Sequence, residues 1–278
     1  ATVPQVVRFG SIGAAAITAN TLKNCIVRNG VNTSSAVVVL DNTGTAGTFN
    51  NITIQNNDVQ KAFVGIFTNA TVGAGNGANL LITQNKLDTS GANAIRNVGI
   101  YVQGADGATV SNNTLGNFEA VTAEADTGIW LATGAVNSAV SGNTVSTIGM
   151  TTSGSFLVSG IRDSGGTATS GNSITGNTIS SISANSSNTA VGPGVAGIET
   201  SSGGTTIQRN SVSGVNNIHT TTYGAAGINV SAGNNAVVRN NFVSGVTGDM
   251  TGGGAFSTTF GIFGIRVATG TGHQVQNN

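Results

Sequence analysis

The chain has 278 residues, of which 42 are glycine and only 7% are charged, against about 7% glycine and about 25% charged residues in ordinary globular proteins. Ten basic residues balance ten acidic ones without any basic cluster, which excludes nucleic acid as a partner because phosphates are bound by several basic side chains. The scarcity of Leu, Glu, Lys and Arg excludes long helices, and no run of about 20 apolar residues predicts a membrane-spanning segment.

The N-terminal part of the chain carries few signals. Its first residues, 1–4, lack the basic stretch and apolar run of a signal peptide. Cys25 is the only cysteine, so it forms no disulfide within the chain, and a single thiol fits both a secreted protein and a reducing compartment. We expect residues 1–31 to form a first, less regular coil of the repeat that fills the rest of the chain.

An asparagine recurs at intervals of 28 to 37 residues. A β-branched residue stands three positions before each, and an apolar residue stands two positions after each wherever the chain continues. These asparagines are Asn29, Asn57, Asn85, Asn113, Asn143, Asn177, Asn210, Asn241 and Asn278. A Gly-Ile pair is a second anchor, at 65–66, 99–100, 128–129, 160–161, 197–198, 227–228 and 264–265, with Val38 in the Ile position of the coil before. Each unit reads as three short strands, which cannot bury their apolar residues alone.

We therefore predict an all-β fold, a single-stranded right-handed parallel β-helix of about nine coils that forms one domain over 1–278, with regular coils from 32 onwards. Coils paired at about 4.8 Å would share a continuous core, and crossover connections between parallel strands are overwhelmingly right-handed. Asparagine tolerates the left-handed backbone of a sharp corner, and its amide can bond to the same amide in the next coil. The spacing thus predicts an asparagine ladder.

Three strings carry a resemblance: Ile54-Gln55-Asn56-Asn57-Asp58-Val59, 110–115 (VSNNTL) and 207–212 (IQRNSV). Together with the recurring Gly-Ile pairs, they resemble the repeats of right-handed parallel β-helix proteins, and most closely the large secreted or cell-surface β-helix proteins of Gram-negative bacteria. The resemblance implies an extracellular or surface location. It does not single out an activity, because this repeat serves lyases, hydrolases, tailspikes, adhesins and purely structural proteins.

Inserts gather at one corner of the predicted solenoid, between the residue after each asparagine and the next Gly-Ile pair, where the number of intervening residues ranges from 5 to 20. Such inserts mark a binding face in many repeat proteins, although surface loops also accept length at little cost. Beside that corner, the residue after each Ile is expected to point outward. This row contains Val39, Phe67, Tyr101, Trp130, Arg162, Glu199, Asn229 and Arg266.

Two interpretations of this row stay open. Phe67, Tyr101 and Trp130, followed by Arg162 and Glu199, would suit a glycan, since aromatic faces bind sugar rings and polar groups bind hydroxyls. Alternatively, the aromatic residues stack on one another to stabilise the solenoid, and Arg162 pairs with Glu199 across coils.

For catalysis, the candidate residues are Asp126, Asp163, Glu199 and Arg162, with Glu124 nearby in the sequence. A pair of carboxyl groups could serve as acid and base in glycoside cleavage. However, Asp163 stands where a side chain faces inward or meets a turn, and no motif resembling those of β-helix hydrolases or pectate lyases is present. His219 and His273 lack further ligands at metal-binding spacing, so we expect no metal and no cofactor.

The sequence stops at a ladder asparagine, before a third strand. We expect a piece of a longer chain, with other domains of that chain as partners; the alternative is end-to-end self-association through exposed coil edges. The leading hypothesis is a non-enzymatic extracellular or surface stalk, adhesin or assembly component with a polysaccharide or cell-surface glycan as a further partner. The alternative is a polysaccharide lyase, glycoside hydrolase or tailspike-like depolymerase.

Overall fold

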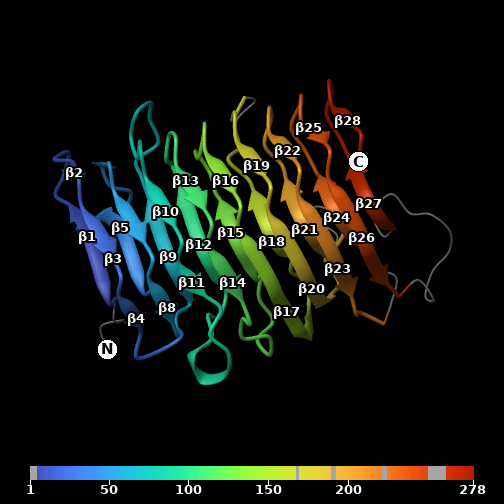
Figure 1. Ribbon diagram of the computed structural model, residues 1–278, viewed down its shortest axis with the longest axis horizontal. Helices are drawn as coiled ribbons and strands as arrows, with labels where there is room; N and C mark the ends of the chain where they lie inside the picture. The colour runs from blue at the N-terminus through green and yellow to red at the C-terminus, as the bar shows by residue number, and fades with distance from the viewer. Residues whose placement is uncertain (1–4, 167–168, 189–191, 221–223, 250–260) are drawn as a thin grey trace.

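A computed structural model describes residues 5–166, 169–188, 192–220, 224–249 and 261–278. The chain is an all-β parallel solenoid whose coils follow one another from the N-terminal end to the opposite end of the stack (Figure 1). Besides strands, the described residues contain one short 3-10 helix, η1 (Gly91–Asn93).

Three parallel sheets form the walls of the solenoid. The first sheet contains β1 (Val7–Ser11), β5 (Val37–Asp41), β9 (Val64–Asn69), β12 (Val98–Gln103), β15 (Thr127–Leu131), β18 (Val158–Asp163), β21 (Val195–Thr200), β24 (Ala225–Val230) and β27 (Ile262–Val267). The second contains β3 (Thr21–Lys23), β7 (Thr53–Gln55), β10 (Leu81–Thr83), β13 (Thr109–Ser111), β16 (Ala139–Ser141), β19 (Ser173–Thr175), β22 (Thr206–Gln208), β25 (Val237–Arg239) and β28 (Gln274–Gln276). The third contains β4 (Ile26–Arg28), β8 (Asp58–Gln60), β11 (Lys86–Leu87), β14 (Thr114–Gly116), β17 (Thr144–Gly154), β20 (Thr178–Ser186), β23 (Ser211–Asn217) and β26 (Phe242–Gly248). A further pair, β2 (Ile17–Thr18) and β6 (Phe49–Asn50), lies between the first and second sheets in chain order.

The number of complete, enclosed coils is about seven, running from β5 to β26, and each of these lies between a coil above and a coil below. The sequence predicted about nine. The difference lies at the ends: β1–β4 form a coil that is stacked on one side only, and β27 and β28 are followed by no third strand in the described part of the chain.

Close packing explains why the Gly-Ile pair recurs together with the apolar residue that follows the asparagine. A Cβ atom on Gly99 would lie 2.4 Å from Leu115 Cδ2 and 2.6 Å from the carbonyl oxygen of Gly128 in the next coil. The same conflict, with a side chain across the core and with the next glycine of the series, arises at Gly65, Gly128, Gly160, Gly197 and Gly227. Ile100, next to Gly99, is fully buried. The pair therefore places glycine where a side chain of the third sheet packs directly against the first sheet, and isoleucine where the core has room for a large side chain.

Seven asparagine-to-asparagine hydrogen bonds run along the corner between the second and third sheets. Each Nδ2 donates to the Oδ1 of the next coil over 2.8 to 3.0 Å, from Asn57 to Asn85 and onward through Asn113, Asn143, Asn177, Asn210 and Asn241 to Asn278. The backbone N–H of each residue donates to the same oxygen. The amides from Asn57 to Asn241 are at least 96% buried, so they depend on these neighbours for their hydrogen bonds.

Two details of the predicted corner are wrong. The first coil does not place Asn29 in this row: Leu22 pairs with Ile54, so Cys25 lies beside Asn57 and donates its backbone N–H to Asn57 Oδ1. The left-handed conformation also belongs to the residue before each ladder position, with φ of 52° at Asn56 and 57° at Gln84. Because that residue supplies the bend, the amide of the ladder residue is left to point inward.

We expect Asn143→Ala to lower the unfolding temperature, because it removes a buried amide that donates to Asn177 Oδ1 and to the Val110 carbonyl and leaves Asn113 without its acceptor. The loss should be about 1–3 kcal/mol. Thr144→Ala, which changes the neighbouring exposed side chain, is the matched control for thermal unfolding followed by circular dichroism. Equal unfolding temperatures for the two variants would contradict a stabilising role for the asparagine row.

We also expect Gly99→Ala to lower the urea midpoint, because overpacking a dense core costs about 1–3 kcal/mol. Gly73→Ala is the control, since a Cβ at Gly73 meets no atom within 4 Å; its effect should stay within about 0.5 kcal/mol. If both substitutions had the same small effect, close packing would not explain the recurrent glycine.

Candidate functional site

The outward row of the first sheet contains residues that the sheet places directly opposite one another in successive coils. Phe67 pairs with Tyr101, Tyr101 with Trp130, and Trp130 with Arg162. Glu199, Asn229 and Arg266 continue the row in the same register. The sequence prediction was wrong in one coil, since Val38 and not Val39 pairs with Phe67. The other seven residues lie in the predicted row.

The three aromatic rings contact one another. Phe67 and Tyr101 are stacked with centroids 5.0 Å apart and planes 7° apart, and Trp130 meets Tyr101 edge-on at 5.2 Å. Their polar atoms have partners as well, because Tyr101 Oη donates to Gln103 Oε1 and Trp130 Nε1 to Ser164 Oγ. Burial raises the pKa of Tyr101. Stacked rings turn their faces toward each other, so this part of the row stabilises the coil stack and leaves little open ring face for a sugar.

The charged and amide residues of the row also make side-chain contacts between coils. The guanidinium carbon of Arg162 lies 4.4 Å from the centroid of the Trp130 ring, and Arg162 Nε lies 3.5 Å from Glu199 Oε2. Glu199 is fully buried, and burial raises its pKa to about 7. In the last coils, Arg266 Nη1 donates to Asn229 Oδ1 over 3.0 Å. The row from Trp130 to Arg266 thus contains two groups of side-chain contacts, one of Trp130, Arg162 and Glu199 and the other of Asn229 and Arg266.

The predicted insert corner is partly regular structure. The third-sheet strands lengthen here, and β17 has 11 residues against 2 in β11. A residue with positive φ, such as Thr147 or Ser181, bends each long strand and lets Ile148 or Ile182 pack inward. Gly192, shortly before β21, lies close to the outward row, because a Cβ at this position would collide with the guanidinium of Arg266.

Of the predicted catalytic residues, Asp163 is committed to a turn. It is fully buried, and it accepts hydrogen bonds from the backbone N–H of Gly165, from Asn172 Nδ2, from Ser202 Oγ and from Thr205 Oγ1. A carboxylate with four such donors is occupied on both oxygens. Although its charge affects the neighbouring Glu199, it has no free oxygen for a substrate.

Asp126 lies elsewhere, in an acidic cluster before β15 that consists of Glu119, Glu124 and Asp126 together with Arg96. Arg96 forms an ion pair with Glu124 and lies over the Phe63 ring at 5.4 Å. Glu119 Oε1 accepts the backbone N–H groups of two residues in its own loop. Asp126 is fully buried, and neither of its carboxylate oxygens has a hydrogen-bond partner. Burial, then the charges of Glu124 and Glu119, raise its pKa to about 9.

The four predicted catalytic residues therefore do not form one constellation. Arg162 and Glu199 contact each other, Asp163 closes a turn at the end of β18, and Asp126 precedes β15 at the other end of the first-sheet strands. Arg96 and Glu119 were missed by the sequence reasoning. Three acidic residues within 119–126, in a chain with only ten, were the signal that could have revealed this cluster.

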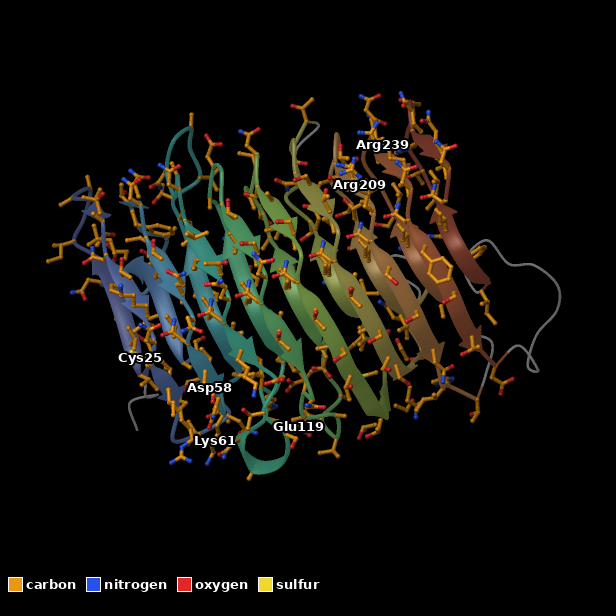
Figure 2. All side chains as sticks on the ribbon, in the orientation of Figure 1. Cys25, Asp58, Lys61, Glu119, Arg209 and Arg239 are labelled. Atoms are coloured by element: carbon orange, nitrogen blue, oxygen red, sulfur yellow. The ribbon has the colours of Figure 1, made fainter. Side chains whose placement is uncertain are left out.

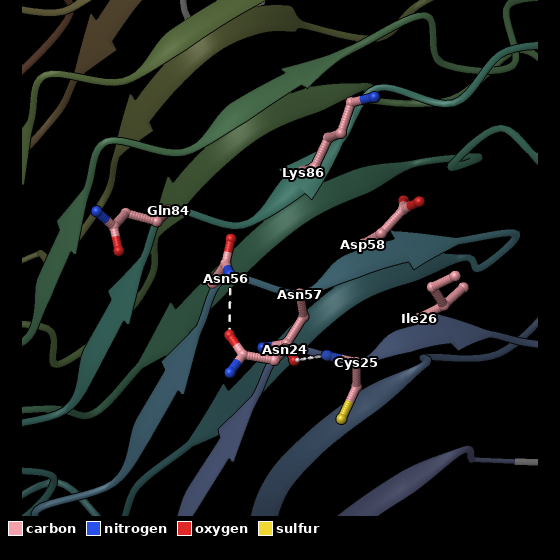
Figure 3. Close-up of a pocket in the computed structure, with 8 residues that line it drawn as sticks. All are labelled: Asn24, Cys25, Ile26, Asn56, Asn57, Asp58, Gln84 and Lys86. Carbon is pink, nitrogen blue, oxygen red and sulfur yellow. Dashed lines mark hydrogen bonds between the residues drawn. The ribbon is translucent and has the colours of Figure 1, made fainter.

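Other surfaces offer little chemistry. A shallow pocket of about 310 Å³ lies in the first coils, where Cys25, Asp58 and Lys86 belong to its lining (Figure 3). The charged side chains labelled on the surface are dispersed, with Arg209 and Arg239 far from Lys61 and Glu119 (Figure 2). Within the described ranges, no group of His, Cys, Asp and Glu is arranged to hold a metal ion, and no helix is long and apolar enough to cross a membrane.

Comparisons of the chain with family models, with curated proteins and with solved structures found no match. The likeness to bacterial β-helix proteins therefore rests on the repeat pattern alone, and what the structure adds is the parallel β-solenoid fold.

We expect Asp126→Asn to become increasingly stabilising as the pH rises from about 4 to about 9. The folded pKa of Asp126 is raised to about 9, above an unfolded value of about 3.9. Its contribution to stability is thus complete below about pH 4 and is lost, by up to about 1.4 kcal/mol per pH unit, as the pH rises. Asparagine cannot ionise and avoids that loss. Urea unfolding at several pH values measures the difference.

Asp106→Asn is a control of opposite sign. Hydrogen bonds from Asn137 Nδ2 and from the backbone N–H of Gly75 lower the pKa of Asp106, so its contribution is present at neutral pH and is lost as the pH falls through that lowered pKa. Asp106→Asn should therefore be less stable than the wild type at neutral pH, and the difference should shrink as the pH falls.

For Asp126→Asn, the contradicting outcome is a stability that varies with pH in the same way as that of the wild type. Such parallel pH profiles would show that Asp126 does not titrate as inferred.

Proposed function

We propose that this chain is a non-enzymatic structural solenoid that acts as a stalk, adhesin or assembly component outside the cell or at its surface. The observation that carries the proposal is the outward row of the first sheet, in which aromatic rings and charged groups contact one another from coil to coil. Such a row uses its chemistry to hold coils together, which is what a rigid spacer requires.

The state of the candidate catalytic groups supports the same proposal. Glycoside cleavage requires two carboxyl groups on either side of a substrate. Here, Asp163 is surrounded by donors from its own coil and from the next coil, Glu199 is fully buried, and Asp126 lies at the other end of the first-sheet strands. None of the three offers an exposed carboxylate oxygen to a polysaccharide.

Glycan contact is a second candidate function, favoured by the partial exposure of Phe67, Tyr101 and Trp130 at neighbouring positions. A sugar would meet ring edges and the surrounding amide and hydroxyl groups, because the ring faces are largely stacked. This contact would be weak, as suits an adhesin that binds through many copies.

A polysaccharide panel and a glycan array test these proposals. We expect no reducing-sugar or unsaturated product above the level of heat-inactivated protein. Product release that disappears in Asp163→Asn or Glu199→Gln would replace the proposal with the enzyme alternative. On the array, glycan binding that is lost in Trp130→Ala would establish an adhesin function at the aromatic residues, whereas no binding by the wild type would end the glycan hypothesis and leave the stalk or assembly role.

A further inference from the structure

Glu199 occupies an unusual environment for a residue of the outward row. It lies on β21 between Arg162 of β18 and Asn229 of β24, and its side chain is fully buried. Ser231, just after β24, donates its hydroxyl to Glu199 Oε1. Asp163 of β18 adds a negative charge, and Arg266 of β27 adds a positive one beyond Asn229. Among these charged groups, Arg162 is the cation that Glu199 directly contacts.

The pair between Arg162 and Glu199 is incomplete. The 3.5 Å between Nε and Oε2 exceeds the about 2.7–2.9 Å of a charge-assisted hydrogen bond. Both atoms are buried and neither has a hydrogen-bond partner. A buried carboxylate that lacks a full set of donors is destabilised relative to its protonated form. Oε2 is thus the atom that would take up a proton.

Arg162 is also the contact between this carboxylate and the only tryptophan of the chain. Its guanidinium lies over the Trp130 ring at 4.4 Å while its Nε faces Glu199. The cation–π attraction between Arg162 and the Trp130 ring is worth about 0.5–2 kcal/mol, which is comparable to the free energy of a loose ion pair. Loss of the charge on Glu199 would therefore change the balance between the two contacts and move the Arg162 side chain.

We propose that Glu199, Arg162 and Trp130 form a pH-responsive contact between three coils, in which protonation of Glu199 releases Arg162 from the carboxylate and alters its position over the Trp130 ring. This device is independent of whether the chain acts as a stalk or binds glycans. Because burial raises the pKa of Glu199 to about 7, the change falls near neutral pH. The raised pKa also means that Glu199 contributes stability below about pH 4, which is lost as the pH rises through about 7.

The intrinsic fluorescence of Trp130 tests the proposal directly. We expect a sigmoidal change in intensity or emission maximum between about pH 5 and about pH 9, with a midpoint near 7. Glu199→Gln, which has the shape of the protonated side chain, should give the acidic-pH signal throughout. Arg162→Met should remove the pH response because no cation remains over the ring.

Two controls separate this device from other titrations. Glu124→Gln alters another carboxylate that pairs with an arginine, and it should keep the transition. A double substitution, His219→Gln with His273→Gln, should also keep it, although histidine is the residue type that ordinarily titrates near neutral pH. Circular dichroism confirms that each variant is folded. Fluorescence that does not vary with pH, or the same transition in Glu199→Gln, would overturn the proposal; if Glu199→Gln did not fold, an unchanged transition in Arg162→Met would do so.

Discussion

Parallel backbone pairing between successive coils is the constraint on which the rest of this structure depends. Strands in adjacent coils lie about 4.8 Å apart, and the second-sheet pairings from β10 to β25 keep residues of one coil beside the equivalent residues of the next. The third sheet does the same from β17 to β26, apart from a register shift between Met150 and Gly154 of β17. A side chain in an enclosed coil therefore lies beside the side chains at the equivalent positions of the coils above and below. Chemistry that suits one coil is repeated, and a residue that repels its copy is disfavoured.

Each row of the solenoid satisfies this constraint in its own way. Inside, Ile54, Ile82 and Val110 stack without exposed area. At the corner, an asparagine is both donor and acceptor, so it can bond to its copies above and below, as Asn85 does with Asn57 and Asn113. Few residue types have this property, which explains the excess of asparagine. Charged side chains lack it, because a charge repels its copy, and this explains why only 7% of the residues are charged.

The same constraint determines how much the sequence could reveal. Rows are visible as periodic residues, so the fold, the first-sheet row and the anchors at Gly99 and Leu115 were predictable. The register of the first coil was not predictable from the sequence, because Cys25 stands where the other coils have the ladder asparagine, and Asn29, four residues later, fits the same sequence pattern. Only the pairing of Leu22 with Ile54 establishes that register. The environment of Asp126 was also beyond the sequence, since burial of a carboxylate by its own insert leaves no periodic trace.

Charged residues on this solenoid are informative about function where the equivalent residues of neighbouring coils are uncharged. Many surface positions use Ser and Thr, which need no countercharge, whereas Arg162 and Glu199 occupy adjacent coils of a row whose other members include three aromatic residues, Asn229 and Arg266. Stacking alone would be served by another aromatic or amide pair, without the cost of burying a carboxylate. A buried, incompletely paired glutamate contributes less to stability than such a replacement would. Glu199 lies one coil beyond Arg162 and two coils beyond Trp130, and the proposed response to protons would account for a buried carboxylate at this position despite its cost.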